Sequence, residues 1–487
     1  MISTMSRRRF LQGIAAGAAV QALGAWRPAA AAEAAAAALA APAPAARPHI
    51  VFLLMDDLGW GDVGYHGSDI RTPAIDSLAA AGVRLEQFYA QPVCSPTRAA
   101  LMTGRYPMRH GLQVDVIYPW SQYGLPLEER TLAQALREAG YETSICGKWH
   151  LGNFRREYLP TARGFEHQYG LYFGATDYFT HLRDGVTLDW HRNDRACREE
   201  GYSTFLIADE AVRRIRERDR ARPLFLYVPF NAVHVPYQAP QKYVEAYAHR
   251  PEPQRTHAAM LAAADEAIGR IVAALDETGL RKDTLIVFSS DNGGDVRPKF
   301  GASNGPYRAG KATLYEGGVR VAAFASWPGR LKAGSVVNEP LHMVDWYPTL
   351  LKLAGARLEQ PLPLDGRDAW PTIAEGRPSP HEEILLNAAP RSGAILVGQW
   401  KLVIALPPAS KANAEAKPPA PAAERVELYH LAADPGEKDD LAAKHPDKVR
   451  DLRARYDALA RQAVPPKAHP KPPDFKPSKV AGEEDTQ

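Results

Sequence analysis

One cysteine of this sequence lies in a run of residues that could perform covalent chemistry. Cys94 opens the segment Cys94-Ser95-Pro96-Thr97-Arg98, which is followed by Thr103-Gly104-Arg105. Pro96 is suited to the first turn of a helix, so Arg98 would lie one turn beyond Cys94 on the same face. Free backbone N–H groups at that helix start, together with Arg98, would attract an anion to the sulfur atom. Alternatively, Cys94 is a buried and inert thiol, as free cysteines often are.

Polar side chains closely follow four predicted strands. Each strand is a short apolar or β-branched run, as expected for the buried strands of a parallel sheet. The four runs and the side chains after them are 49–55 with Asp56 and Asp57, 285–290 with Asp291 and Asn292, 143–146 with Lys148 and His150, and 224–228 with His234. Because open parallel sheets gather their ligand sites at the carboxyl ends of strands, we expect these side chains to lie at one edge.

The acidic members of this set suggest a metal site. Asp56, Asp57, Asp291 and Asn292 offer only oxygen donors, which favours a hard cation, Ca²⁺ or Mg²⁺, over zinc. Without a cation, three clustered carboxylates would repel one another and any anionic substrate. The alternative is that Asp56 and Asp57 only turn the chain after a strand, as such residues commonly do.

The basic members suggest binding of an anion and proton transfer. Lys148, His150, His234 and Lys311 lie in the local segments 147–152, 231–236 and 310–320, and they would act together with Arg98. Taken singly, a lysine is usually solvated and a histidine usually structural. Three further histidines, His110, His181 and His342, are expected to be structural. Residues 169–181 form either part of a substrate wall or an aromatic packing loop.

From residue 47 onward, strand-like runs alternate with helical patterns. This order predicts an α/β fold with a large, mostly parallel central sheet covered by helices. Near the C-terminus we expect a helix at 345–354, strands at 394–397, 400–404 and 426–429, and a charged helix at 446–463. These elements predict a smaller C-terminal antiparallel sheet with a helix packed beside it.

Composition divides the chain into parts. We predict a signal peptide (1–32), an Ala/Pro-rich leader (33–46), a main domain (47–385), a C-terminal subdomain (386–464) with a flexible loop at 407–424, and a disordered tail (465–487). The loop and the tail are rich in proline and lysine, and the loop also in alanine, so they would bury little apolar surface.

The N-terminus reads as an export signal. Ser6-Arg7-Arg8-Arg9-Phe10-Leu11 resembles the twin-arginine signal, and a Gly/Ala-rich apolar stretch follows it to Trp26. A membrane anchor is the alternative, but the stretch contains Gln12 and Gln21, and no apolar run of about 20 residues appears elsewhere. We therefore expect a periplasmic or secreted protein, carried by the bacterial twin-arginine export machinery and without a stable membrane anchor.

Charge and cysteine content exclude two classes of protein. The formal net charge is +3, and removal of the signal with its four arginines leaves about −1, which argues against a nucleic-acid partner. Three cysteines, one of them in the motif, do not form a disulfide scaffold. Cys146 and Cys197 could form a disulfide in an oxidising compartment, but we expect Cys146 to be reduced and buried.

The segments around Cys94, Lys148, His234 and Lys311, in this order, resemble the type I sulfatases of the alkaline-phosphatase superfamily. The resemblance implies that a maturation enzyme oxidises Cys94 to formylglycine. The hydrated aldehyde would attack sulfur, form a sulfo-enzyme intermediate, and then expel sulfate. It also implies a Ca²⁺ site, with Mg²⁺ as an alternative, formed by Asp56, Asp57, modified Cys94, Asp291 and Asn292.

The same resemblance implies a role for each cationic residue. Arg98 and Lys148 would hold the formylglycine hydrate and the sulfate. His150 would be the base that returns the sulfo-enzyme to the aldehyde. His234 and Lys311 would bind sulfate and protonate the leaving alcohol.

Within this family the sequence is most similar to the arylsulfatase B, or N-acetylgalactosamine-4-sulfatase, group. The similar stretches include 147–152, 159–165, 177–181, 345–350 and 363–370, and the likeness runs from about residue 48 to about 441. The chain lacks most cysteines of that group, notably around 120–125, so its loops would be held differently.

We therefore expect a Ca²⁺-dependent sulfatase that hydrolyses a sulfate ester to an alcohol and inorganic sulfate. The substrate would be a sulfated carbohydrate, such as the 4-sulfate of N-acetylgalactosamine in chondroitin or dermatan fragments, or an aryl sulfate. One alternative is a formylglycine-dependent phosphonate or phosphate ester hydrolase. Another is a non-catalytic protein that binds sulfated glycans and leaves Cys94 unmodified.

Overall fold

The structure is a computed structural model that describes residues 47–405 and 424–482. The predicted signal peptide and leader lie outside the described residues, as does all of the predicted loop at 407–424 except its last residue.

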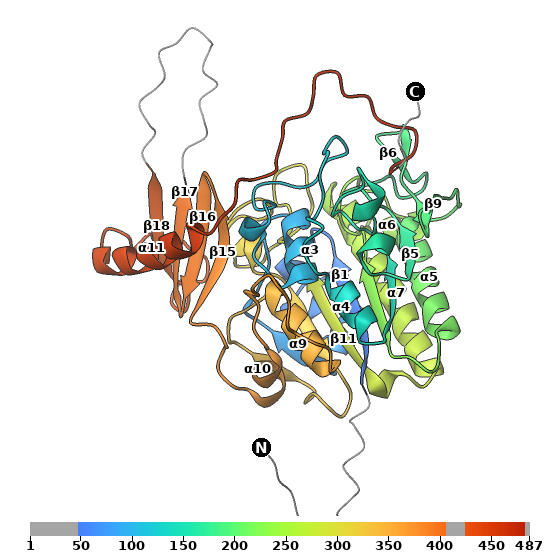
Figure 1. Cartoon of the computed structure of the whole chain (residues 1–487), viewed down its shortest axis with the longest axis horizontal. Helices are drawn as coiled ribbons and strands as arrows, with labels where there is room; N and C mark the ends of the chain where they lie inside the picture. Colours follow the sequence, from blue (N-terminus) through green and yellow to red (C-terminus); the bar gives the residue numbers. More distant parts are fainter. Residues whose placement is uncertain (1–46, 406–423, 483–487) are drawn as a thin grey trace, which may run out of the picture. The chain divides into compact units, whose positions relative to one another are not determined.

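A large mixed sheet forms the centre of the described chain (Figure 1). In spatial order its 10 strands are β13 (Ser335–Val337), β2 (Val83–Leu85), β12 (Ala323–Ser326), β11 (Thr284–Ser290), β1 (His49–Met55), β10 (Leu224–Pro229), β4 (Glu142–Cys146), β5 (His167–Gly170), β8 (His191–Arg192) and β9 (Arg195–Ala196). The five strands from β11 to β5 run parallel, and antiparallel pairs flank them on both sides. The predicted fold class is confirmed, and all four strands expected to carry site residues belong to this parallel centre.

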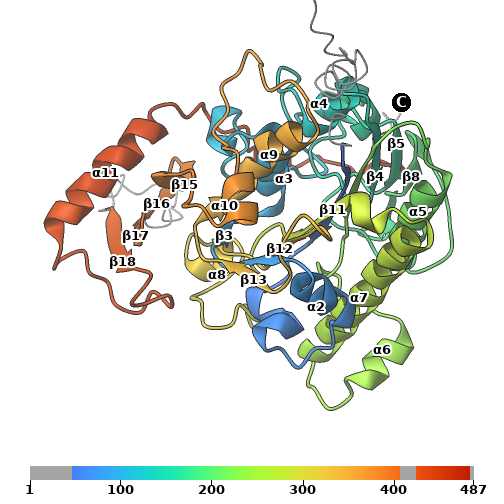
Figure 2. The same ribbon diagram turned by 90° about the horizontal axis from the view of Figure 1, so that it is seen from below.

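Helices cover both faces of the sheet, because its central strands are apolar on both sides. In β1, Ile50, Phe52 and Leu54 pack into one core and Val51, Leu53 and Met55 into the other. The first core is completed by α3 (Cys94–Thr103), α4 (Leu132–Glu138), α9 (Trp346–Leu353) and α10 (Trp370–Glu375), and the second by α2 (Pro73–Ala80), α5 (Ser203–Glu217) and α7 (Gln254–Glu277) (Figure 2).

A second sheet follows the central one. Its four antiparallel strands are β15 (Glu383–Ala389), β16 (Ser392–Val397), β17 (Trp400–Ala405) and β18 (Arg425–His430), with α11 (Pro446–Ala460) packed against them. The expected antiparallel sheet and helix are therefore present. The sequence did not predict β15, in which Asn387 and a register shift between Leu385 and Asn387 interrupt the apolar run.

A buried ion cluster joins this second sheet to the rest of the protein. Lys401 of β17 lies 2.9 Å from Glu316 Oε1 and 2.8 Å from Glu437 Oε1. Glu316 begins the short helix α8 (Glu316–Val319), which follows the loop that carries Lys311. All three side chains are fully buried. We call Glu316, Lys401 and Glu437 the Lys401 cluster.

The tail differs from the sequence expectation. Composition predicts disorder from residue 465, whereas the structure places residues 465–482 against the main body. Val480 pairs with Leu188 of β7 (Thr187–Leu188), and Ala481 is buried in the core. A few backbone and apolar contacts therefore hold a segment whose own composition could not order it.

Within the described ranges, no helix has the length and apolar character needed to cross a membrane.

Candidate active site

The carboxyl ends of β1 and β11 bring four polar residues together. The two strands pair in parallel with Met55 opposite Ser290, so Asp56 and Asp57 lie beside Asp291 and Asn292. The backbone N–H of Asp57 donates to Asp291 Oδ1 at 3.2 Å, and Asn292 Nδ2 donates to Asp57 Oδ1 at 2.8 Å. The predicted convergence at one edge of the sheet is present in the structure.

Cys94 lies at the start of α3, directly beside this acidic group. Its Sγ is 3.4 Å from Asp56 Oδ1. No side chain caps the helix start, so its first N–H groups remain available to a ligand. Burial raises the pKa of the Cys94 thiol well above its ordinary value. An unmodified Cys94 would therefore be a poor nucleophile, because the thiolate is the reactive form.

The donor atoms suit a hard divalent cation. Ligand atoms of Asp56, Asp57, Cys94 and His234 all lie within 4.8 Å of one another. Asn292 Oδ1 is buried and has no hydrogen-bond partner among the described residues, although buried oxygens of this kind are normally satisfied. A cation beside the carboxylates would satisfy it, and oxygen donors favour Ca²⁺ or Mg²⁺. The residues present therefore fit the expected metal.

Each carboxylate of the site has a different nearest cationic side chain, and Arg98 Nη2 also lies 3.9 Å from Asp56 Oδ2. Lys148 Nζ lies 2.6 Å from Asp56 Oδ2, and Lys311 Nζ lies 2.7 Å from Asp57 Oδ2. Arg98 donates to Asp291 Oδ2 from two nitrogens, at 2.8 and 3.1 Å, and to the carbonyl of Lys148 at 3.0 Å. The expected residues Arg98, Lys148 and Lys311 thus all belong to one buried network of charges.

The two neighbouring aspartates differ in their electrostatics. Burial raises the pKa of Asp56 to about 7, although Lys148 acts in the opposite direction. Burial also acts to raise the pKa of Asp57, but Lys311 and His234 outweigh it and hold that pKa below its usual range. Burial, with Lys311, lowers the pKa of His234 to about 3. The positive charge around Asp56 is therefore incomplete, and a bound divalent cation would complete it.

The site backbone includes left-handed residues that are not glycine. Asp57 and His150 both have a φ of 59°, and Ala309 and Ala312, on either side of Lys311, have φ values of 59° and 68°. Such conformations cost about 1 kcal/mol or more each and persist only where the surrounding structure imposes them. They place the side chains of Asp57, His150 and Lys311 where a regular backbone would not.

A cavity of about 270 Å³ opens above this network. Of the predicted residues, Cys94, His150, His234 and Lys311 line it. Asp56, Asp291, Asn292, Arg98 and Lys148 are fully buried and Asp57 nearly so, and none of these six is among the lining residues. The site therefore has two layers, a lining that substrate can touch and a charged layer of buried side chains around it.

His150 is held with one ring nitrogen free. Its Nε2 lies 3.1 Å from the carbonyl of Ile117, which can only accept, so Nε2 carries the proton and Nδ1 a lone pair. Nδ1 is buried and has no partner among the described residues. Gly174 packs on the ring, because a Cβ there would lie 2.5 Å from His150 Cε1. His150 thus presents an unprotonated nitrogen without a partner among the described residues, and burial together with Lys148 lowers the pKa of this imidazole well below its ordinary value.

Several residues around the cavity were not predicted from the sequence. Asp115, Tyr118 and Arg183 line it, and the Tyr118 hydroxyl donates to Asp115 Oδ1 at 3.0 Å. Ser95 donates to the His150 carbonyl and accepts from Ile117 N–H, which ties the 115–119 loop to α3. Only Ser95 stood in a recognisable motif. Asp115 and Tyr118 lie in a loop and Arg183 in the two-residue strand β6, and no sequence pattern marked any of the three.

The residues expected to be structural lie away from the cavity. His110, His181 and His342 are buried and absent from its lining. Residues 169–181 combine both expected roles, since Tyr172 and Tyr178 are buried while Gly174 lines the cavity. In the structure Cys146 and Cys197 are free thiols.

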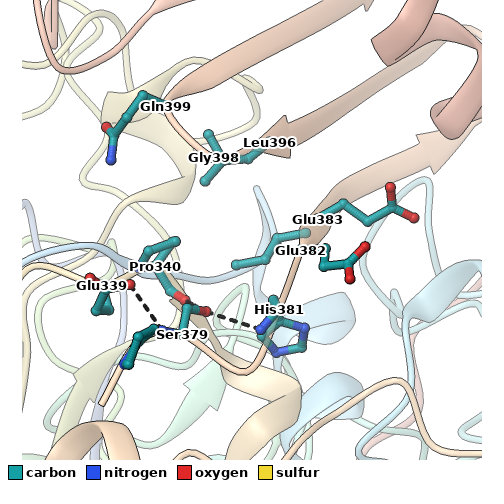
Figure 3. Close-up of a pocket in the computed structure, with 11 residues that line it drawn as sticks. Glu339, Pro340, Ser379, His381, Glu382, Glu383, Leu396, Gly398 and Gln399 are labelled. Atoms are coloured by element: carbon teal, nitrogen blue, oxygen red, sulfur yellow. Dashed lines mark hydrogen bonds between the residues drawn. The ribbon is translucent and has the colours of Figure 1, made fainter. Parts of the chain in front are cut away.

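Another pocket, of about 200 Å³, lies between the loop before β14 (Leu341–His342) and the second sheet (Figure 3). Its histidine, His381, donates from its backbone N–H to Ser379 Oγ at 3.2 Å, and its ring lies 2.7 Å from Asp345. The His381 side chain is only 4% exposed. None of the predicted site residues lines this pocket, so we do not regard it as the active site.

Comparisons with known proteins identify relatives over most of the chain. Residues 48–356 match the Sulfatase family. Arylsulfatase J of Mus musculus is 38% identical over 473 residues, which cover 89% of this chain and 79% of that protein. The N-acetylgalactosamine-6-sulfatase of Mus musculus is 33% identical over 453 residues, covering 85% of this chain and 86% of that protein.

Solved structures agree with these relatives. The structure of Ps i-CgsB in complex with k-i-k-neocarrahexaose superposes with a TM-score of 0.77 at 31% identity, covering 86% of this chain and 94% of that one. A phosphonate monoester hydrolase of Agrobacterium radiobacter shares the fold alone, with a TM-score of 0.59 at 21% identity over 84% of this chain and 96% of that one.

Proposed function

This chain belongs to the sulfatase family, whose members hydrolyse sulfate esters, and we propose that its ester is carried by a carbohydrate. The 4-sulfate of N-acetylgalactosamine in chondroitin or dermatan fragments is the first candidate substrate, and aryl sulfates are the second. The observation that supports this reaction is a single cavity lined by Cys94, His150, His234 and Lys311.

Cys94 lines the cavity, but burial raises its thiol pKa and makes the thiol itself a poor nucleophile. Oxidation of Cys94 to formylglycine would give the same position a reactive group. Formylglycine would supply a hydrated aldehyde, with one hydroxyl to attack sulfur and a second to expel sulfate afterwards. Its hydroxyls would be oxygen donors beside Asp56, which suits a hard cation better than the sulfur of cysteine does.

The buried layer would stabilise negative charge. Arg98 and Lys148 are fixed by Asp291 and Asp56, so their positive charge is already oriented before substrate binds. Charges that need no reorganisation during the reaction stabilise the developing anion most effectively. A divalent cation held by Asp56, Asp57, Asp291 and Asn292 would polarise the sulfuryl oxygens as a Lewis acid.

The cavity lining would move protons. His150 presents an unpaired Nδ1 beside Cys94, so it can act as the base that restores the aldehyde. Lys311 and His234 lie on the Asp57 side of the cavity, with His234 Nε2 3.6 Å from Asp57 Oδ2. There they would bind sulfate, and they would protonate the leaving alcohol once the bound anionic ester has raised the pKa of His234 from about 3.

Support for a carbohydrate comes from the named relatives and from a neighbouring cavity. One relative is an N-acetylgalactosamine-6-sulfatase, and one similar structure contains a carrageenan oligosaccharide. Beyond His234 and Arg183 lies a further cavity of about 410 Å³, which shares both residues with the first. A substrate with more than one sugar residue could occupy both cavities.

The maturation and the reaction are tested together. Mass spectrometry of the tryptic peptide that ends at Arg98 should show a sulfur-free aldehyde at position 94 in protein from the native host. The protein should release sulfate from N-acetylgalactosamine 4-sulfate and 4-nitrophenyl sulfate, and turn over 4-nitrophenyl phosphate at least about 10²-fold more slowly. Cys94→Ala is the control. An alkylatable thiol in active protein, or a preference for phosphate, would contradict the proposal.

We also propose export by the twin-arginine route, which carries folded proteins and would allow Cys94 to be oxidised before export. The supporting residues, Arg7, Arg8 and Arg9, lie outside the described part of the chain. Replacing all three with lysine should leave the protein in the cytoplasmic fraction of its host. Unchanged periplasmic recovery would argue against this route.

A further inference from the structure

The segment after α11 crosses from the second sheet to the side of β6 (Leu182–Arg183) and β7 (Figure 1). We call residues 465–482 the C-terminal segment. Its start is held by Lys467 N–H, which donates to the Gly111 carbonyl at 2.8 Å. Its end is held on β7, where Leu188 N–H donates to the Lys479 carbonyl and Ala481 N–H donates to the Leu188 carbonyl. The segment is therefore anchored by its backbone at both ends.

Aromatic contacts bring the middle of the segment next to the Cys94 cavity. Tyr118 lines that cavity, and its ring stacks on Trp120 with centroids 4.4 Å apart. Trp120 in turn contacts Phe475 of the segment, with centroids 6.0 Å apart. Pro119 lines both the Cys94 cavity and a cavity of about 170 Å³ that Phe475 and Lys476 help to form. The segment is thus connected to the lining of the Cys94 cavity through Trp120 and Pro119.

The described part of this segment is basic. It carries Lys467, Lys471, Lys476 and Lys479 against one acidic residue, Asp474, and Glu483, Glu484 and Asp485 follow it outside the described residues. Lys471, Lys476 and Lys479 are exposed, and no carboxylate of the described residues forms a salt bridge with any of them. Lys471 Nζ lies 5.7 Å from the centre of the Trp120 ring. Charges without partners beside a cavity for an anionic ester attract further anionic groups.

The composition of the segment also favours binding. Six of its eighteen residues are prolines, which keep the chain extended and leave little conformational freedom to lose. The backbone anchors at Lys467 and Lys479 do not involve side chains, and the Lys471 ammonium lies over the rings of Trp120 and Phe475 without a carboxylate partner among the described residues. The segment therefore presents its lysines in a row at low entropic cost.

We propose that the C-terminal segment is an auxiliary binding surface for a sulfated glycan. Lys471, Lys476 and Lys479 bind anionic groups, sulfate or carboxylate, on sugar residues next to the one whose ester is hydrolysed. This inference rests on the proposed sulfatase function and specifies its substrate as a polyanionic oligosaccharide rather than a small aryl sulfate. Removing the segment would expose the site of Ala481, so the test neutralises its charges and leaves its backbone in place.

The test compares two sets of substitutions that remove the same total charge. One variant is Lys471→Gln/Lys476→Gln/Lys479→Gln. Its control is Lys282→Gln/Lys332→Gln/Lys444→Gln, three exposed lysines that line none of the cavities described here. Both are made in the Cys94→Ser background and titrated by calorimetry with chondroitin 4-sulfate and carrageenan hexasaccharides. Because the Cys94→Ser background does not require turnover, binding can be measured even if the proposed reaction is wrong.

The segment variant should bind the better hexasaccharide about tenfold more weakly than the control at about 20 mM salt. At about 500 mM salt the difference should shrink to about twofold, because exposed charges are screened. Equal affinity of the two variants at low salt, or no binding of either hexasaccharide by the parent, would overturn the inference.

Kinetics on proteins that retain Cys94 separate the two proposals. The segment variant should raise the KM for the hexasaccharide about tenfold and keep kcat within about twofold. If the parent releases sulfate from no ester at all, the proposed function fails. If it releases sulfate and the KM values of the segment variant and the control agree, only the role of the segment fails.

Discussion

The charges around Cys94 and those of the Lys401 cluster are both buried, but only the first group adjoins a cavity. Around Cys94, three carboxylates lie among three cations, with Arg98 near both Asp291 and Asp56, and Asn292 Oδ1 is still left without a partner among the described residues. In the Lys401 cluster, one ammonium bridges two carboxylates, and the Glu316 N–H donates to Glu437 Oε2 at 2.6 Å. None of its three members lines a described cavity.

This difference separates a site that binds ligands from a structural cluster. Burial acts to raise the pKa of Glu316, but Lys401 and Arg320 hold it below its usual range. Near Cys94, by contrast, the pKa of Asp56 is raised to about 7, so the protein alone does not fully stabilise its charge. Buried charge that is incompletely compensated is typical of functional sites. The predictions below test whether loss of charge costs activity in one group and stability in the other.

Lys311→Ala should give the largest effect, about a 10³-fold loss of kcat/KM for an aryl sulfate, or about 4 kcal/mol. Its ammonium lines the cavity and pairs with Asp57 on the proposed leaving-group side. The midpoint of thermal unfolding should change by only a few degrees. Lys332→Ala, at an exposed position, is the control. If kcat/KM fell less than tenfold, Lys311 would not have the proposed role in the reaction.

Lys401→Met should destabilise the protein by about 3 kcal/mol, because it leaves Glu437 buried without a counter-ion and Glu316 with Arg320 alone. Denaturant unfolding measures this loss, and kcat/KM of the folded variant should fall less than tenfold. A triple variant that adds Glu316→Gln and Glu437→Gln should recover more than half of the stability. If activity fell as far as in Lys311→Ala, the contrast between the two groups would be lost.

Metal binding should stabilise the protein through the Cys94 group alone. Metal-free protein supplied with Ca²⁺ at about 100 times its dissociation constant should gain about 2.7 kcal/mol, or a rise in unfolding midpoint of about 2–4 °C. Asp57→Asn should abolish this rise. Lys401→Met should lower the unfolding midpoint of the metal-free protein but show the same rise when Ca²⁺ is added. A rise that survives Asp57→Asn would place the cation elsewhere.

The smallest effect concerns the two glutamates of the Lys401 cluster. Burial raises the pKa of Glu437 above its ordinary value, whereas that of Glu316 is lowered. The ionised form is therefore more strongly stabilised at Glu316 than at Glu437, so loss of the charge at Glu316 should cost more stability. We expect Glu316→Gln to cost about 2 kcal/mol and Glu437→Gln about 1 kcal/mol in denaturant unfolding. The reverse order would show that the charge resides mainly on Glu437.

Much of the fold and of the site could be predicted from local patterns. The run 49–55 forms β1 with the same bounds, because an uninterrupted apolar run is a buried strand in a parallel sheet. Asp56, Asp291, Lys148 and His234 were expected at one edge because parallel strands end together, and the structure brings them there. Sequence patterns failed at β15, where Asn387 and a register shift interrupt the apolar run.

The sequence by itself thus determined the fold class, the family and the kinds of group that meet at Cys94, because these follow from residue type and local spacing. Only the tertiary structure decided which cation pairs with which carboxylate, and that Tyr118 and Arg183 line the cavity. It also decided that a proline- and lysine-rich tail lies beside that cavity, held by Trp120 and Leu188. These contacts join residues that are far apart in the sequence. Local sequence patterns do not predict which distant residues will be in contact.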